Sequence, residues 1–328
     1  MRILAFEVRE DEQFYFEEIE AKHPELEITL VKEALSLKNI RLCKEYEAVT
    51  ILGMNQINHE ILDQLKENGI RFLATRTVGY DHIDIKYAKK IGIRVCNASY
   101  APDSVADFTI MLILLALRKY KPAIYRQNVN DFSLHGLLGK TMSSLTIGVV
   151  GTGKIGGAVI RNLSGFGCNI LAYNRTPQEE YRKWVTYTDL DTLYQNSDVI
   201  TFHVPLKKET KRLVQEETLA KMKDGVILIN TARGELMDVD NLIKGIENQK
   251  IGALAMDVFE DENDIYHENH MNDIITNKNM AYLRQFPNVI LTQHMAFYTE
   301  SAVKEMVTYA ISGILSMKEE VFWPQELT

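Results

Sequence analysis

Cysteine is scarce in this chain, with only three among 328 residues. Cys43, Cys96 and Cys168 lie far apart, without a CxxC pair or a histidine at metal-ligand spacing. This pattern argues against a disulfide framework and against a zinc site, so no metal is expected. We expect reduced, packed thiols in a cytoplasmic protein.

Basic tracts and long apolar runs are also missing. The formal net charge is −8, and no cluster of Lys and Arg would attract a nucleic acid or an anionic membrane. The longest apolar block, residues 108–117, is too short to span a bilayer and predicts a buried helix. The first residues become acidic at Glu7 and contain no apolar signal core, so no secretory signal is expected.

A glycine-rich turn is the strongest positive signal. The pattern predicts a strand, a turn, a helix and a second strand: residues 145–150, Gly151-Thr152-Gly153-Lys154-Ile155-Gly156, a helix to about residue 163, and residues 170–173. Gly151 permits the tight turn, Gly153 lets a pyrophosphate approach the backbone, and Gly156 lets the helix pack closely on the strand. A bare GxGxxG can be a simple turn, but this one lies within the βαβ unit that dinucleotide binding requires.

The second strand of this unit is not followed by a carboxylate. An NAD site would place Asp or Glu there to hold the ribose 2′-hydroxyl, whereas this chain has Asn174, Arg175 and Thr176. A cation would pair with the 2′-phosphate of NADP, so the sequence favours NADP(H). The alternative is that Arg175 is a solvated loop residue and that NAD(H) is used.

The first hundred residues lack such a glycine turn but alternate short apolar runs with helical segments. Strands are predicted at 3–8, 28–31, 48–52, 71–78 and 94–97, with helices at 12–22 and 58–68. Alternating βα units predict an α/β fold with a parallel sheet. Val78 and Gly79 follow the fourth of these strands, where bare N–H groups could meet a carboxylate; a simple turn explains them equally well on local grounds. The helix that Pro102 starts is apolar on nearly every face, so we expect it between domains or subunits.

Polar residues follow successive strands in the second half. Strands are predicted at 198–204, 225–229, 251–256 and 289–292, a polar insertion without a period at 260–285, and a helix at 299–317. Because parallel strands end at one edge of a sheet, Arg233, Asp257, Glu262 and His294 should converge near the nicotinamide. A cation, an acid and a proton donor suit hydride transfer to a carbonyl. Each residue alone could be structural, and the pattern does not separate Glu262 from Glu260.

Five motifs carry a resemblance to a known family: VGTGKIGGAVI, HVPLKKETK, GVILINTARGEL, ALAMDVFEDE and NVILTQHMAFYT. They resemble the D-2-hydroxyacid dehydrogenase family. The stretch APDSVADFTIMLIL, the Asn-Arg strand end and the long insertion before His294 are similar to its D-lactate dehydrogenase branch, most of all the vancomycin-resistance type. The chain departs from the family pattern at Ala232, where a glycine is usual, and at Gln293, where a proline is usual.

The resemblance implies roles for individual residues. It makes Arg233, Glu262 and His294 the catalytic arginine, acid and histidine. It assigns the substrate carboxylate to the Val78 and Gly79 amides, and the substrate pocket to Tyr100 and Phe297. Cofactor contacts fall on Gly151, Gly153, Lys154, Ile155, Gly156, Asn174, Arg175, Thr176, His203, Val204, Pro205, Thr210, Thr231, Ala232 and Asp257. For Asp257 a purely structural role is nearly as well supported.

The resemblance also implies the architecture and the reaction. Two Rossmann-like domains are expected: a discontinuous, flavodoxin-like substrate domain at 1–100 and 298–328, and a dinucleotide-binding domain at 101–297. The helix after Pro102 would form a homodimer. The reaction would reduce pyruvate or a similar small 2-oxo acid to the D-2-hydroxy acid. The alternatives are a 2-hydroxyisocaproate-type enzyme for branched or aromatic 2-oxo acids and, from another class, a nucleotide-sensing corepressor.

Overall fold

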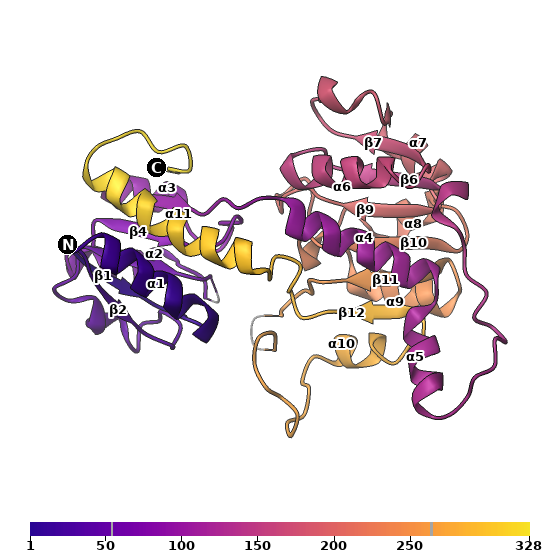
Figure 1. Cartoon of the computed structure of the whole chain (residues 1–328), viewed down its shortest axis with the longest axis horizontal. Helices are drawn as coiled ribbons and strands as arrows, with labels where there is room; N and C mark the ends of the chain where they lie inside the picture. The colour runs from indigo at the N-terminus through magenta and orange to yellow at the C-terminus, as the bar shows by residue number, and fades with distance from the viewer. Residues whose placement is uncertain (54, 263–264) are drawn as a thin grey trace. The chain divides into compact units, whose positions relative to one another are not determined.

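The computed structural model describes residues 1–53, 55–262 and 265–328 and divides the chain into two compact units (Figure 1). The first unit comprises Met1–Ala101 and Tyr298–Thr328, and the second comprises Pro102–Phe297. Both units are built on a parallel sheet, so the predicted α/β class is confirmed. The roles of the units as substrate and cofactor domains remain predictions at this stage.

The sheet of the first unit has five strands in the order β2-β1-β3-β4-β5. Their bounds are β1 (Arg2–Ala5), β2 (Glu27–Leu30), β3 (Ala48–Ile51), β4 (Phe72–Thr75) and β5 (Arg94–Asn97). All neighbouring strands are parallel. This is the flavodoxin-like order, which places ligands at the carboxyl edge of the strands. The strands predicted at 3–8 and 71–78 are shorter in the structure, because the chain leaves the ladder after Ala5 and Thr75.

Helices cover both faces of this sheet. On one face lie α1 (Glu10–Lys22) and α11 (Glu300–Lys318); on the other lie η1 (Ile40–Cys43), α2 (His59–Glu67) and α3 (Ile85–Ile91) (Figure 1). The side chains of Asn58 and Asp84 cap α2 and α3 by accepting backbone N–H bonds. Cys43 and Cys96 are buried free thiols of these cores.

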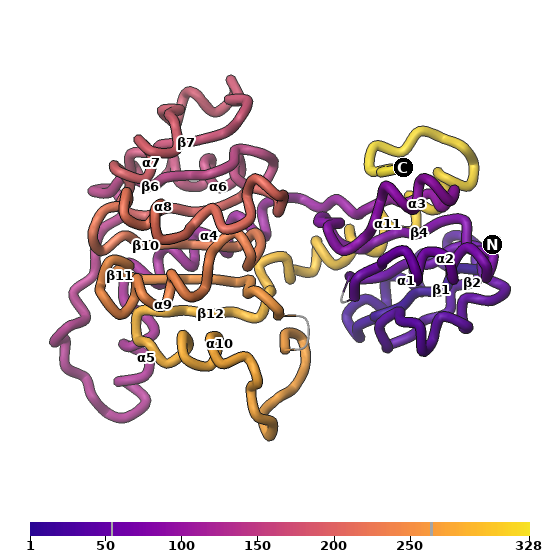
Figure 2. Tube along the Cα trace, turned by 180° about the vertical axis from the view of Figure 1, so that it is seen from behind, coloured from indigo at the N-terminus to yellow at the C-terminus, as the bar shows by residue number. Residues whose placement is uncertain are grey.

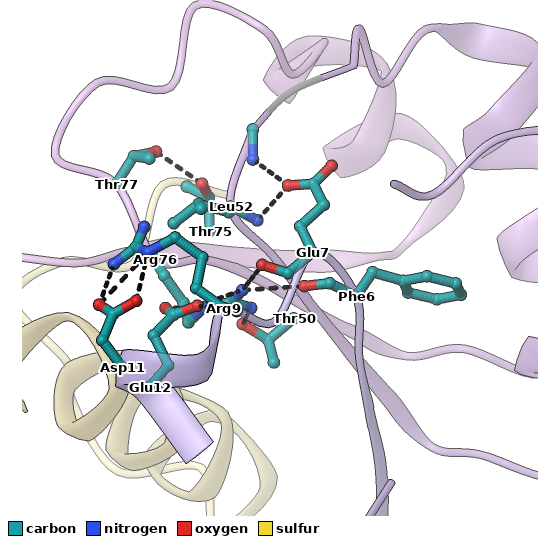
Figure 3. Close-up of polar contacts among 11 residues, drawn as sticks. Phe6, Glu7, Arg9, Asp11, Glu12, Thr50, Leu52, Thr75, Arg76 and Thr77 are labelled. Atoms are coloured by element: carbon teal, nitrogen blue, oxygen red, sulfur yellow. Dashed lines mark hydrogen bonds and ion pairs between the residues drawn. The ribbon is translucent and has the colours of Figure 1, made fainter. Parts of the chain in front are cut away.

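A buried ion pair joins β4 to α1. Arg76 and Glu12 both have fully buried side chains, and Arg76 Nε lies 2.8 Å from Glu12 Oε1 (Figure 3). Arg76 Nη2 also donates to the carbonyl oxygens of Phe6 at 2.8 Å and Glu7 at 3.0 Å. These bonds fix the turn that follows β1 against the end of β4.

The sheet of the second unit has seven strands in the order β12-β11-β10-β9-β6-β7-β8. Their bounds are β6 (Thr146–Val150), β7 (Asn169–Tyr173), β8 (Thr186–Tyr187), β9 (Val199–Phe202), β10 (Val226–Asn230), β11 (Ile251–Met256) and β12 (Val289–Leu291). β6 lies between β7 and β9, so the strand order reverses there. This reversal is the crevice at which doubly wound sheets bind dinucleotides.

Two layers of helices cover this sheet. One face carries α4 (Asp103–Leu117) and α6 (Lys154–Ser164); the other carries α7 (Leu190–Asn196), α8 (Glu216–Lys221), α9 (Val239–Glu247) and α10 (Lys278–Leu283). Figure 2 shows α8 and α9 on the side of the sheet opposite α4. The remaining helical segments are α5 (Tyr120–Asn128), η2 (Met142–Ser144), η3 (Glu179–Tyr181) and η4 (Gly234–Leu236).

The helix α4 packs on α6 and on β10 and β11 within the second unit. Its expected place between domains or subunits stays a prediction. The polar insertion 260–285, in which the sequence shows no strong period, contains α10, which the Asn277 side chain caps by accepting the N–H of Met280. Among the residues that the structure describes, none of the helices combines the length and apolar character needed to cross a bilayer.

The buried ion pair generates a stability prediction. Replacing Arg76 by Met leaves the Glu12 carboxylate buried without its cation, so the free energy of unfolding of the first unit should fall by about 3 to 5 kcal/mol. Trp184 and Trp323 are the two tryptophans, and a Trp184→Phe background makes Trp323 the reporter of the first unit during urea unfolding. The control is Arg2→Met, whose pair with Glu45 is exposed and should contribute at most about 1 kcal/mol. Equal losses in both variants would contradict the role given to Arg76.

Candidate active site

The glycine turn forms a cradle at the amino end of α6. Gly151 has φ +94°, and a Cβ there would lie 2.7 Å from the carbonyl oxygen of His203. A Cβ at Gly156 would collide with the carbonyl of Gly151, which is why the helix can approach the turn only without a side chain. A Cβ at Gly153, by contrast, would meet no atom within 4 Å. Open space above a helix amino end fits a pyrophosphate group.

The end of β7 borders this cradle. Asn174 Oδ1 accepts the N–H of Thr152 at 3.4 Å, and its Nδ2 donates to the carbonyl of Thr176 at 2.7 Å. Arg175 and Thr176 are exposed. The Asn174 side chain therefore links the end of β7 to the glycine turn. The residue after it, Arg175, is a cation rather than a carboxylate.

The other residues assigned to the cofactor lie around the same edge. Lys154 and Ile155 begin α6, and Val204 and Pro205 follow β9. The hydroxyl of Thr210 closes the turn after β9 by donating to the carbonyl of Pro205 at 2.7 Å. The hydroxyl of Thr231 lies 3.0 Å from that of Thr109 on α4.

His203 is a histidine that stays neutral. Its Nε2 lies 2.9 Å from the hydroxyl of Thr201, and burial lowers the pKa of His203 to about 3. A histidine with this pKa carries no proton to give at neutral pH. His203 therefore suits cofactor packing and not acid catalysis.

The turn after β10 presents Arg233. Asn230 holds both ends of this turn, since its Nδ2 donates to the carbonyl of Arg233 at 2.8 Å and its Oδ1 accepts the N–H of Ala232 at 3.0 Å. Arg233 is half-buried, and its Nη1 donates to the carbonyl of Ala232 at 2.7 Å. A Cβ at Gly234 would collide with the backbone of Phe259. The turn with Arg233 thus lies directly against the segment that leads to Glu262.

The side chains of His294 and Glu262 form a close hydrogen-bonded pair. His294 Nδ1 lies 2.5 Å from Glu262 Oε1, and Glu262 Oε2 accepts the N–H of Phe259 at 2.5 Å. The side chain of Glu262 is 14% exposed and that of His294 is 33% exposed. With Nδ1 directed at the carboxylate, Nε2 is the nitrogen that can face a substrate. The geometry selects Glu262 over Glu260, which the sequence pattern could not do.

Asp257 holds the backbone around His294 in place through hydrogen bonds. Its fully buried carboxylate accepts the Thr292 hydroxyl at 2.6 Å and the N–H groups of Met295 at 2.9 Å and Ala296 at 2.7 Å. Its carbonyl accepts the N–H of His294 at 2.7 Å. Burial raises the pKa of Asp257, and the hydrogen bonds act in the opposite direction. The geometry favours the structural role that the sequence left open; a cofactor contact stays a prediction.

His267 is a site residue that sequence reasoning missed. Its Nε2 lies 3.3 Å from the carbonyl oxygen of His294, and its ring centroid is 6.4 Å from that of Phe297. The rings of His294 and Phe297 are 6.3 Å apart. His267 belongs to the insertion without a period, so no sequence signal pointed to it.

In the first unit, the turn after β4 offers two backbone N–H groups. Asn97 Nδ2 donates to the carbonyl of Val78, and the Thr77 hydroxyl donates to the carbonyl of Gly79, both at 2.7 Å. Within the described part of the chain, the N–H groups of Val78 and Gly79 have no acceptor. This arrangement fits the predicted carboxylate contact. Tyr100, half-buried, lies a few residues beyond β5.

A nucleotide cradle and an imidazole–carboxylate pair on one parallel sheet define a dinucleotide-dependent oxidoreductase. The comparisons with known proteins agree. Residues 110–296 match the model described as D-isomer specific 2-hydroxyacid dehydrogenase, NAD binding domain. The chain belongs to this family, which confirms the resemblance seen in the motifs.

Individual relatives extend the similarity over nearly the whole chain. An aromatic 2-oxoacid reductase of Clostridium sporogenes is 40% identical over 316 residues, 96% of this chain and 95% of the relative. A D-specific alpha-keto acid dehydrogenase of Enterococcus faecium is 41% identical over 290 residues, 88% and 89%. The structure of D-lactate dehydrogenase from Aquifex aeolicus, complexed with NAD and lactic acid, has a TM-score of 0.88 at 31% identity and covers 97% of this chain and 96% of its own.

The support of His294 by Asp257 generates a prediction. Asp257→Asn keeps the shape but replaces one acceptor oxygen by a donor that faces the N–H and hydroxyl donors, so the turn at 292–296 should shift. A shift of His294 should lower kcat by roughly tenfold to a hundredfold while cofactor affinity, measured by fluorescence titration, stays near wild type. Asp261→Asn, an exposed acid of the same segment, is the matched control. Lost cofactor affinity with unchanged kcat would instead make Asp257 a cofactor contact.

Proposed function

We propose that the chain reduces pyruvate, or a similar small 2-oxo monocarboxylic acid, to the D-2-hydroxy acid and prefers NADPH. The observation that carries the proposal is the pair His294–Glu262, held by Asp257 at the strand edge that also bears Arg233 and the glycine cradle. Family membership supports the reaction type. We also propose that the chain belongs to the branch of the vancomycin-resistance D-lactate dehydrogenases. This proposal rests on the motif APDSVADFTIMLIL, which follows Tyr100.

Each residue has a chemical task in this proposal. When bound, the cofactor supplies the hydride that reaches the carbonyl carbon of the substrate. The guanidinium of Arg233 binds the substrate carboxylate and polarises the ketone, and the Val78 and Gly79 N–H groups bind the same carboxylate. His294 gives the proton on Nε2 to the developing alkoxide. Glu262 keeps the proton on Nδ1 and stabilises the imidazolium.

Aromatic 2-oxo acids are the second candidate substrates. The Clostridium sporogenes relative is named for them, and the rings of His267 and Phe297 lie beside the ring of His294, the predicted proton donor. An aromatic wall favours an aryl side chain by ring contacts. The ratio of kcat/KM for phenylpyruvate to kcat/KM for pyruvate decides between the two classes.

We also propose a cytoplasmic homodimer. The apolar side chains that the second unit exposes support an interface near α5 and the segment after it: Tyr125 is 69% exposed, Phe132 75%, Leu134 83% and Leu138 87%. Exposed apolar side chains in such number mark an interaction surface. Sedimentation velocity of the purified chain measures the mass that decides this point.

The proton-donor role makes a first prediction. His294→Asn removes the acid, so kcat for 2-oxo acid reduction should fall by roughly a hundredfold or more while the reduced cofactor still binds. Glu262→Gln removes the charge that stabilises the imidazolium and should lower kcat less, by roughly tenfold. Glu260→Gln is the matched control and should leave kcat near wild type. If the control matched Glu262→Gln, the acid would be wrongly assigned.

The cofactor preference makes a second prediction. A charge-assisted contact of Arg175 with a 2′-phosphate contributes roughly 1.5 to 3 kcal/mol, so kcat/KM should be about ten- to a hundredfold higher with NADPH than with NADH. Arg175→Ala should remove most of this preference, and Asn174→Asp should reverse it by repelling the phosphate. Arg182→Ala, a nearby exposed arginine paired with Glu179, is the control. Equal effects of Arg175→Ala on both cofactors would show that Arg175 is only a surface residue.

A further inference from the structure

The residues that carry Arg175 have no regular structure of their own. Between β7 and α7 the chain forms a loop that contains η3 and ends in β8 (Figure 1). The first part of this loop, the segment 174–178, forms neither helix nor strand. In the proposed function this segment faces the 2′-phosphate of the cofactor through Arg175. Its position therefore depends on contacts that other parts of the second unit supply.

The hydroxyl of Tyr187 links this segment to the glycine turn. It donates to the hydroxyl of Thr152 at 3.0 Å and accepts the N–H of Gln178 at 3.1 Å. Thr152 belongs to the glycine turn and is only 1% exposed, so one end of this bridge is fixed in the interior. Tyr187 itself is held in β8, where it lies opposite Ala172 of β7. The bridge thus connects the last residue of the segment to a rigid part of the sheet edge.

The direct bond between the segment and the glycine turn is longer than either bond of this bridge. Asn174 Oδ1 accepts the N–H of Thr152 at 3.4 Å. The side chains of Asn174 and Gln178 also donate to the carbonyl of Thr176, at 2.7 and 3.4 Å, but these two bonds lie within the segment. They shape the segment without attaching it to the turn. The Tyr187 hydroxyl is therefore well placed to fix where the segment lies.

We propose that Tyr187 is a positioning residue for cofactor selection, because its hydroxyl holds the segment 174–178 against the glycine turn. The inference rests on the proposed function, in which Arg175 pairs with the 2′-phosphate. A cation on a loosely held segment must be ordered when it binds a phosphate, and the lost conformational freedom weakens binding. The two bonds of Tyr187 order the segment before the cofactor arrives. NADH has no 2′-phosphate, so the benefit should fall mainly on NADPH.

Equilibrium binding without substrate tests this role. Tyr187→Phe keeps the ring and removes the hydroxyl with both of its hydrogen bonds. The Kd of NADPH, from titration of its fluorescence, should rise roughly three- to tenfold, while the Kd of NADH should change by less than about twofold. In turnover the loss should appear in the KM for NADPH rather than in kcat. Tyr282→Phe is the matched control, since that hydroxyl bonds to Glu247 and joins α10 to α9.

A double variant shows whether Tyr187 acts through Arg175. Effects that share one path are not additive, so Tyr187→Phe should not raise the Kd of NADPH further in an Arg175→Ala background. A tyrosine that only supported the fold would weaken both cofactors by the same factor in either background. Hydrogen exchange of the cofactor-free chain gives a readout without any ligand: the segment 174–178 should exchange faster in Tyr187→Phe than in wild type.

The outcomes separate this inference from the proposed function. An unchanged Kd of NADPH in Tyr187→Phe, equal changes for both cofactors, or a full effect in the Arg175→Ala background overturns the role of Tyr187. The proposed cofactor preference survives these results if the wild-type chain binds NADPH more tightly than NADH and Arg175→Ala removes the difference. If the wild-type chain bound NADPH no more tightly than NADH, that preference would fail and this inference with it.

Discussion

The buried carboxylate of Asp257 is the constraint on which the site depends. Two N–H groups and one hydroxyl from the turn at 292–296 bind its oxygens, and its own carbonyl binds the N–H of His294. His294 adopts φ +52°, a conformation that a non-glycine residue holds only when its surroundings determine it. Through this turn, the end of β11 sets the direction of the imidazole at the end of β12, and Glu262 then sets its tautomer.

Parallel pairing places the chemistry on one edge. In the second unit, the glycine cradle follows β6, Arg233 follows β10, Asp257 follows β11 and His294 follows β12. Each of these groups therefore lies just beyond the carboxyl end of a strand. Glycine is required where backbones must touch: at Gly156 against Gly151, and at Gly234 against Phe259. The same principle shapes the first unit, where Glu7, Leu52 and Val78 follow three adjacent strands. Sheet geometry, rather than local sequence, brings these groups together.

The sequence predicted those strands whose bounds follow from the local pattern of apolar and polar residues. The strands at 94–97 and 251–256 have the predicted bounds, because apolar runs between polar turns leave little choice. The partners of individual carboxylates could not be predicted: Glu262 rather than Glu260 binds His294, 32 residues away, and Glu7 binds the N–H of Leu52, 45 residues away. His267 and α10 lie in a segment without periodicity, whose structure follows from tertiary contacts and from the cap by Asn277. Contacts between side chains far apart in the chain form only in the folded protein, and they produce no periodic pattern in the sequence.

Hydride transfer to the carbonyl carbon of a 2-oxo acid, followed by protonation at oxygen, is the central claim. The most direct measurement incubates the wild-type chain with pyruvate and NADPH that carries deuterium at both C4 positions. Chiral chromatography and mass spectrometry of the product then give its configuration and its isotope content. We expect D-lactate with one deuterium on C2, and this deuterium should not exchange with solvent. An L-configured product, a C2 position without deuterium, or no reduction of pyruvate or of any other 2-oxo acid would contradict it.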